Sequence, residues 1–280
     1  MATVHSHAYE VRRAAANPGL KFLQRLGYVV RGVLYATMGV LALRIALGKP
    51  DGRATDLNGS LLFLIGNPFG KWLLFIAIVG LAAYSLWGLI RAGFDPLHRG
   101  SDPSGYMQRL GFLSSAASYG AIALFSVQIL MGTTPSGGDP TQKTIDSVLI
   151  HPAGGLLTIG IGLVAIGIGV GQFVEAYRAV FKRDLKGAEM TQTEREVVVA
   201  LGRFGMFARG VLFTIIGWFL LQAGMQHDPS KAQSFGGAFL FLLQQPYGPL
   251  LLGLVALGLV ALGLHSLACA RWVRLMGSSS

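Results

Sequence analysis

The sequence predicts an all-α, polytopic membrane protein: six transmembrane helices that form three parallel two-helix repeats around a pseudo-threefold axis. Apolar residues make up 52% of the 280 residues and charged residues only 13%, which is about half the charged fraction of a soluble protein. Six apolar stretches reach the roughly 20 residues that a hydrocarbon core requires. One sequence pattern also recurs three times in register, which is typical of an internal repeat.

The six predicted spans follow a basic N-terminal segment. They run near residues 28–47, 71–91, 110–131, 154–175, 205–224 and 249–270. Residues 1–24 are polar and basic and precede a full-length span, so we expect a cytoplasmic tail rather than a cleavable signal peptide. The single cysteine, Cys269, excludes an intrachain disulfide.

Lysine and arginine are distributed unevenly between the loops. The N-terminal tail, the loops at 91–109 and 178–203 and the C-terminus, with Arg31 and Arg209 at their edges, hold 17 of the 23 Lys and Arg residues. Loops rich in these residues stay on the cytoplasmic side. Both termini are therefore predicted to be cytoplasmic, with the protein in the inner cell membrane. The net charge of +10 is attributed to orientation and to anionic lipid, and no nucleic-acid partner is expected.

This orientation predicts a labelling pattern in intact cells. Cysteines introduced near Asp139 and Asp228 should react with a membrane-impermeant thiol reagent added from outside, because their loops carry few positive charges. Cysteines near Arg99 and Lys186 should stay unlabelled until the membrane is opened. The reverse pattern would contradict the predicted topology.

Two short motifs mark the three repeats. R-[LF]-G begins at Arg25, Arg109 and Arg203, and P-x-G begins at Pro68, Pro152 and Pro246, so that 43 residues separate arginine from proline in every copy. A constant interval of this kind indicates repeated structural units. The units are predicted to be residues 25–100, 101–194 and 195–276. A ring around a pseudo-threefold axis is the favoured arrangement of these units, and a linear row of hairpins is the alternative.

Small residues occupy equivalent positions when the repeats are aligned. Odd-numbered spans share three such columns: Gly32, Ala116 and Gly210; Ala36, Gly120 and Thr214; Gly39, Ala123 and Gly217. Even-numbered spans share two more: Ala83, Gly167 and Ala261; Ser85, Gly169 and Gly263. Their spacing places them on one helix face, where small side chains allow close helix contact in lipid.

A short apolar segment precedes each P-x-G motif. These segments, near residues 61–67, 145–151 and 238–245, are too short to span a membrane. We expect interfacial or re-entrant helices on the outer side.

The motif R-x-G-x-x-x-R-G at the start of an odd-numbered span, together with P-x-G before an even-numbered one, resembles a known sequence pattern. The chain is similar over about residues 20–275 to the bacterial "domain of unknown function 1206" membrane family. The resemblance implies three copies of a two-helix unit and supplies no activity. The middle copy departs from the pattern, because Ser115 stands where the other copies have Arg31 and Arg209.

Arg31 and Arg209 lie about one helical turn inside the predicted cytoplasmic boundary, and three interpretations are open. Their side chains could snorkel to the headgroup region. They could pair with Glu175, the one carboxylate within a predicted span. They could also form a site for a small anion or a lipid phosphate, because the positive ends of the odd-numbered helices gather on this side. The candidate anion site comprises Arg25, Arg31, Arg109, Arg203 and Arg209.

Catalytic and metal-binding patterns are not recognisable in this sequence. No nucleophile–base arrangement, carboxylate pair or nucleotide-binding motif stands in a suitable setting, so we expect no enzyme activity, no cofactor and no metal. His265 is predicted to be a packed or hydrogen-bonded histidine rather than a haem ligand.

Two function classes remain from the sequence. The favoured class is a non-enzymatic lipid-binding or accessory membrane protein, whose partners are membrane lipids, anionic headgroups among them. The alternative is a small channel or carrier with a pathway along the pseudo-threefold axis. Gln128, Gln172 and Gln222 are polar residues within spans that could line such a path, although interhelical hydrogen bonding is the commoner use of such residues. The sequence does not identify a protein partner.

Overall fold

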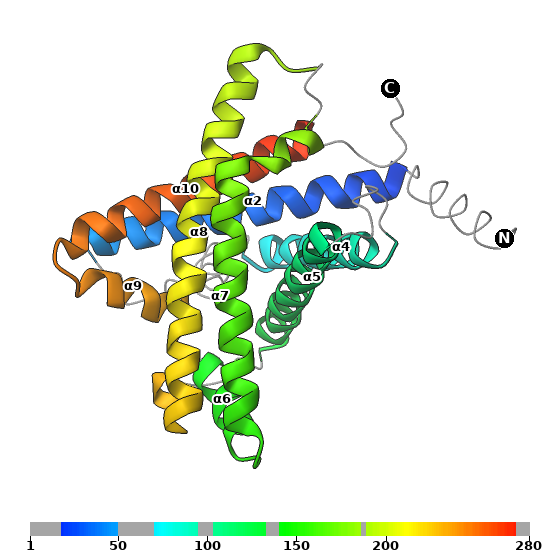
Figure 1. Ribbon diagram of the computed structural model, residues 1–280. Coiled ribbons are helices and arrows are strands. Elements are labelled where there is room, and N and C mark those ends of the chain that lie inside the picture. The colour runs from blue at the N-terminus through cyan, green and yellow to red at the C-terminus, as the bar shows by residue number, and fades with distance from the viewer. Residues whose placement is uncertain (1–17, 50–69, 95–102, 133–139, 186–188, 273–280) are drawn as a thin grey trace, which may run out of the picture.

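The structure is a computed structural model that describes residues 18–49, 70–94, 103–132, 140–185 and 189–272 (Figure 1). Its long helices are α2 (Pro18–Ala46), α4 (Gly70–Phe94), α5 (Pro103–Leu130), α7 (Gly154–Arg178), α8 (Gln192–Gln226) and α10 (Gly248–Trp272). Its shorter elements are the helices α6 (Pro140–Leu149) and α9 (Phe235–Leu243) and the 3-10 turns η1 (Val180–Asp184) and η3 (Pro229–Lys231). Residues 1–17 of the predicted N-terminal tail lie outside the described residues.

The long helices coincide with the six predicted spans. Helices α2, α5, α7, α8 and α10 contain segments long and apolar enough to cross a membrane, and α4 contributes a shorter apolar stretch, Leu74–Ile90. The predicted polytopic all-α fold is therefore confirmed.

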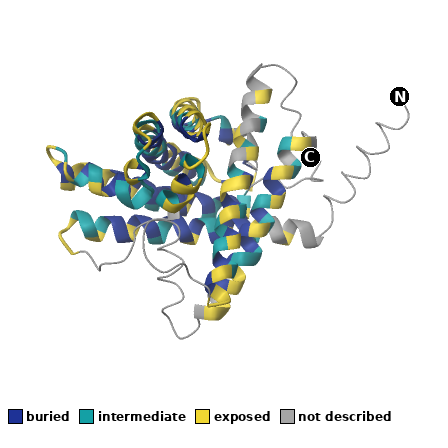
Figure 2. Ribbon diagram, turned by 90° about the horizontal axis from the view of Figure 1, so that it is seen from below, coloured by how far each residue is buried: buried dark blue, intermediate teal, exposed yellow. Residues whose placement is uncertain are grey.

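Helix α7 shows how these helices divide their faces between protein and lipid. Its buried residues are all small: Gly154, Gly155, Thr158, Gly162, Ala165, Gly169 and Ala176. Large apolar residues such as Leu156, Leu163 and Val164 are exposed instead, and the exposed positions lie on the outer faces of the helices (Figure 2). Lipid would cover the large side chains, while small side chains let the helices approach one another.

Local sequence signals explain where several helices begin. Helices α7 and α10 start at the glycine of P-x-G, where a Cβ would overlap the carbonyl of Val148 or Leu243 in the preceding short helix segment. Helix α8 begins after a capping box. The Thr191 hydroxyl accepts a hydrogen bond from the backbone N–H of Glu194, and the Glu194 carboxylate accepts one from the backbone N–H of Thr191.

Each even-numbered span packs most closely against the odd-numbered span of the next repeat. The close pairs are α4 with α5, α7 with α8, and α10 with α2. The last pair joins the third repeat back to the first. Within a repeat, α2 packs against α4, and α8 packs against α10. The repeats therefore interleave, and α2 and α10 lie at the centre of the assembly.

The three close pairs use the small-residue columns in the same way. A Cβ built on Gly169 would lie 2.9 Å from the carbonyl oxygen of Gly210, and one on Gly263 would lie 2.7 Å from that of Gly32. In the third pair, the Ser85 hydroxyl donates to the Ala116 carbonyl at 2.7 Å. The predicted role of these two columns in close helix contact is confirmed.

The pairs do not run parallel to one another. The α7–α8 pair crosses the α2–α10 pair steeply in Figure 1 and is viewed nearly end-on in Figure 2. Contact between α2 and α10 rules out a simple row of hairpins in chain order. Among the described residues, α5 and α7 do not form an extensive contact. The described long helices therefore pack as an open series, α7–α8–α10–α2–α4–α5, and not as a closed ring.

Two further expectations have mixed outcomes. Gly167, predicted to lie on a packed face, is exposed, and a Cβ there would meet no atom within 4 Å. Ala261, its counterpart in the third repeat, is buried. The short segments before Pro152 and Pro246 contribute to α6 and α9, whereas the segment before Pro68 lies outside the described residues.

Candidate functional site

Arg31 projects from α2 into a group of tyrosines. Its guanidinium carbon lies 5.4 Å from the ring centroid of Tyr84, 5.7 Å from that of Tyr35 and 5.9 Å from that of Tyr119. One guanidinium nitrogen also donates a hydrogen bond to the Tyr84 hydroxyl at 2.5 Å. The tyrosines contact each other, since the Tyr119 hydroxyl donates to the Tyr35 hydroxyl at 3.2 Å and Tyr84 packs edge-on against Tyr119. Aromatic faces attract a guanidinium through their negative quadrupole.

Arg209 reaches the same group of tyrosines from α8. Its guanidinium carbon lies 5.8 Å from the Tyr35 ring centroid and 5.1 Å from that of Phe213. Only 7% of Arg209 is exposed. A snorkelling side chain keeps its charge in water, whereas this guanidinium lies among aromatic rings. We call Arg31, Arg209, Tyr35, Tyr84 and Tyr119 the arginine–tyrosine centre.

Equivalent positions of the three repeats meet at this centre. Tyr35, Tyr119 and Phe213 follow the arginine position by one helical turn in their respective copies. Tyr35 bonds to Tyr119, and Arg209 contacts both Tyr35 and Phe213. Residues related by a rotation can touch only near the rotation axis, so the predicted pseudo-threefold axis would pass close to this centre.

The remaining arginines of the predicted anion site have other surroundings. Arg109 donates to the carbonyls of Ala92 at 2.8 Å and Gly93 at 2.9 Å, at the end of α4. Arg203 donates to the Tyr177 carbonyl at 2.9 Å, which is the equivalent bond at the end of α7. Both arginines satisfy orphan carbonyls at a helix C-terminus. Arg25 is exposed. The structure therefore brings together Arg31 and Arg209 but not all five arginines.

Glu175 is a half-buried residue near the end of α7. The contacts of Arg31 and Arg209 among the described residues are to aromatic side chains. An ion pair of either arginine with Glu175 stays a prediction.

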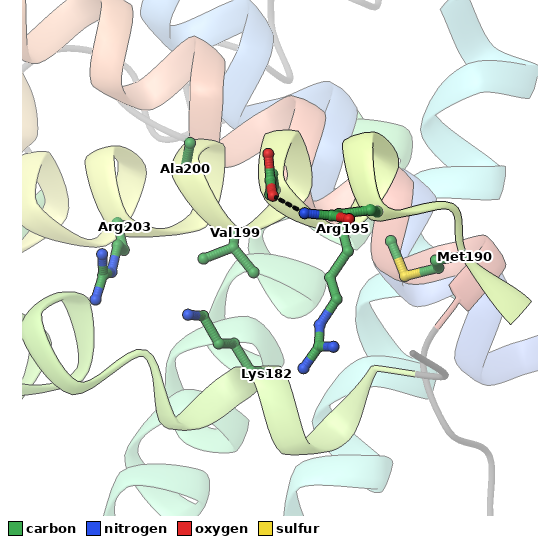
Figure 3. A pocket seen from close by; sticks show the side chains of 8 residues that line it. Lys182, Met190, Arg195, Val199, Ala200 and Arg203 are labelled. Carbon is green, nitrogen blue, oxygen red and sulfur yellow. Dashed lines mark hydrogen bonds between the residues drawn. The ribbon is translucent and has the colours of Figure 1, made fainter. Parts of the chain in front are cut away.

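A basic hollow opens beside the C-terminal end of α7. It has a volume of about 720 Å³ and is lined by Lys182, Met190, Gln192, Arg195, Glu196, Val199, Ala200 and Arg203. Figure 3 shows Lys182 rising from η1 while Arg195 and Arg203 reach from α8 toward the same gap. The carboxylate of Glu196 accepts a hydrogen bond from the Gln192 amide at 3.0 Å. Three cations therefore surround a hollow whose lining includes one carboxylate.

His265 packs inside the protein as a hydrogen-bonded histidine. Its Nδ1 lies 2.9 Å from the Val198 carbonyl, its ring packs edge-on against Phe181, and its Nε2 lies 3.4 Å from the Cys269 sulfur. In the described part of the chain, no group of three or more His, Cys, Asp or Glu residues is arranged to hold a metal ion.

Two parts of these sites were missed by reasoning from the sequence alone. Tyr35, Tyr119 and Phe213 occupy equivalent positions in the repeat alignment. This aromatic column is a sequence signal that could have identified the centre. The hollow had no comparable signal, because it forms where η1 turns back against α8.

Comparison with known proteins agrees with the repeat architecture. The family described as Domain of Unknown Function (DUF1206) matches the chain three times, at residues 26–95, 110–179 and 204–273. The chain belongs to this family. Each match covers one predicted pair of spans, so the family repeat is the two-helix unit.

A relative of similar length exists in Bacillus subtilis (strain 168). This Uncharacterized protein YxxB is 35% identical over 239 residues, which cover 85% of this chain and 86% of the relative. No solved structure matches the chain. This DUF1206 member is thus a multi-pass membrane protein whose activity must be argued from its own sites.

Proposed function

We propose that this DUF1206 protein is a non-enzymatic membrane protein that binds the phosphate of anionic lipid headgroups in the basic hollow. The observation that carries the proposal is the meeting of Lys182, Arg195 and Arg203 around one open space of about 720 Å³. Guanidinium groups present planar pairs of N–H donors that match phosphate oxygens, and an ammonium adds a point charge.

The position of the hollow suits a lipid. Arg203 lines the hollow and also bonds to the carbonyl of Tyr177, whose side chain is 84% exposed. The exposed apolar residues Val170 and Val174 lie one to two turns further back along α7. A headgroup in the hollow would leave its acyl chains room along this apolar face. The positive-inside rule predicts that the 178–203 segment is cytoplasmic, where anionic lipid attracts basic segments.

A channel or carrier along the pseudo-threefold axis is the alternative. The described residues favour it less, because Tyr35, Tyr119 and Met38 are fully or almost fully buried in the core. Gln128, which was considered as a pore-lining residue, is exposed on α5. These features support lipid binding at the periphery over conduction through the centre.

The test is binding of phosphatidylglycerol to the purified protein, measured by native mass spectrometry. Changing Lys182 and Arg195 together to Gln should weaken binding roughly 30-fold, because each surface cation contributes about 1 kcal/mol to attraction of anionic lipid. Phosphatidylcholine should bind more weakly than phosphatidylglycerol and respond little to the two substitutions.

Matched single variants distinguish lipid binding in the hollow from a general effect of positive charge on lipid binding. Arg203→Gln and Arg109→Gln each remove one positive charge and the equivalent bond to a helix C-terminus, but only Arg203 lines the hollow. Arg203→Gln should weaken phosphatidylglycerol binding several-fold, whereas Arg109→Gln should leave it close to wild type. Equal loss in both variants would reject the hollow as the lipid site.

A further inference from the structure

The arginine–tyrosine centre brings two positive charges together among aromatic side chains. Arg31 and Arg209 contact aromatic rings, and Arg31 also donates a hydrogen bond to the Tyr84 hydroxyl. Removing a guanidinium from water without a counter-charge is costly, and cation–π contacts offset only part of that cost. Two such groups beside one Tyr35 ring also repel each other. These aromatic and hydroxyl contacts bring no negative charge to the two guanidinium groups.

The same centre contains donors that have no acceptor. The Nε atoms of Arg31 and Arg209 are both buried, and neither has a hydrogen-bond partner among the described residues. Arg209 as a whole is more than nine-tenths buried. Buried N–H groups are normally paired with protein or with a bound species. Because Tyr119 donates to the Tyr35 hydroxyl, the proton of Tyr35 is available as another donor.

We propose that the arginine–tyrosine centre binds a small monovalent inorganic anion of the chloride class between Arg31 and Arg209. Such an anion accepts hydrogen bonds from all directions, so it can accept from both Nε–H groups and from a tyrosine hydroxyl. Because Arg209, Tyr35 and Tyr119 are buried, the ligand carries no bulky organic group. This site is separate from the basic hollow, whose cations are exposed, and it does not depend on the lipid proposal.

The repeat pattern accounts for the number of charges. A full threefold column would place a third arginine at position 115, where the middle repeat has a half-buried serine. The centre thus receives two guanidinium groups, and one monovalent anion would reduce their net charge to a single positive charge.

The experiment measures thermal stability of the full chain in a neutral detergent while chloride replaces gluconate at constant ionic strength. Gluconate serves as the bulky anion that should not enter the centre. At about 100 times its dissociation constant, chloride should raise the melting temperature of the wild type on the order of 5 °C. Equilibrium dialysis with radioactive chloride should find one bound ion per chain.

Variants identify the residues that hold the anion. Arg209→Gln should abolish the chloride-dependent shift, and Arg209→Lys, which keeps the charge but loses the forked donor, should reduce it. Tyr35→Phe should weaken chloride binding several-fold. Arg203→Gln should retain the full chloride shift while its phosphatidylglycerol binding is weakened several-fold, which keeps this site and the lipid site distinguishable.

Three outcomes would overturn the inference. The first is a wild-type protein equally stable in chloride and gluconate, with no ion retained in dialysis. The second is an equal chloride shift in wild type and in both Arg209 variants. The third is stabilisation by inorganic phosphate or by phosphatidylglycerol at the centre without stabilisation by chloride, which would assign the buried arginines to phosphate groups. The comparison of the wild-type protein in chloride and in gluconate tests the proposal by itself. The test therefore stands even if a variant folds poorly.

Discussion

Replacing Gly217 with leucine is expected to destabilise the fold by about 3 kcal/mol, near the upper end of the cost of overpacking a core. A Cβ at Gly217 would lie 2.7 Å from the carbonyl oxygen of Gly162 and 2.7 Å from Cγ1 of Ile166. A backbone carbonyl cannot move aside as a flexible side chain can, so α7 and α8 must separate. Gly39→Leu should behave alike, because its Cβ would lie 2.7 Å from the Ala256 carbonyl oxygen between α2 and α10.

Gly167→Leu is the matched control for this prediction. Gly167 lies in α7, as does Gly162, but a Cβ there meets no atom within 4 Å, and leucine favours the helix more than glycine does. Thermal unfolding in detergent should therefore show a large loss for Gly217→Leu and Gly39→Leu, with little change for Gly167→Leu. Wild-type stability in the first two variants would mean that these helix pairs do not form the described contacts.

Tyr119→Ala is expected to cost about 3–5 kcal/mol, as large-to-small substitution of a buried aromatic residue does. Tyr119 is only 2% exposed, and it packs edge-on against Tyr84, bonds to the Tyr35 hydroxyl and lies 5.9 Å from the Arg31 guanidinium. Its loss would leave a cavity and would remove one of the aromatic rings that surround a buried cation.

Tyr177→Ala provides the comparison for Tyr119→Ala. Tyr177 is 84% exposed, and Arg203 contacts it through its backbone carbonyl, which alanine retains. Unfolding measurements in the same detergent should therefore show a small change for Tyr177→Ala. If both tyrosine variants are equally stable, the aromatic residues of the arginine–tyrosine centre do not form a packed core.

Much of the helix packing could be predicted from the sequence because small residues have few other uses inside an apolar span. The Gly32 and Gly263 columns recur at equivalent positions in every repeat, and the structure joins them in three equivalent contacts. Partner choice could not be predicted in this way. A small face fits any other small face, so the small-residue columns alone do not specify that α10 packs against α2 or α4 against α5.

The candidate site was only partly predictable for a related reason. Arg31 and Arg209 were identified from their unusual depth, but sequence spacing does not specify whether a long side chain turns outward to water or inward to aromatic rings. Arg109 and Arg203 have the same charge and form bonds to helix carbonyls instead. The basic hollow depends on the turn of η1 against α8, which is a tertiary contact without a local sequence pattern.

Lipid recognition in the basic hollow is the central claim, and a cryo-EM map of the protein in nanodiscs containing phosphatidylglycerol tests it most directly. The claim predicts density for a phosphate within hydrogen-bonding distance of Arg203 and close to Lys182 and Arg195, with acyl-chain density along the exposed face of α7. An empty hollow in a well-resolved map, with ordered lipid only elsewhere around the helices, would contradict it.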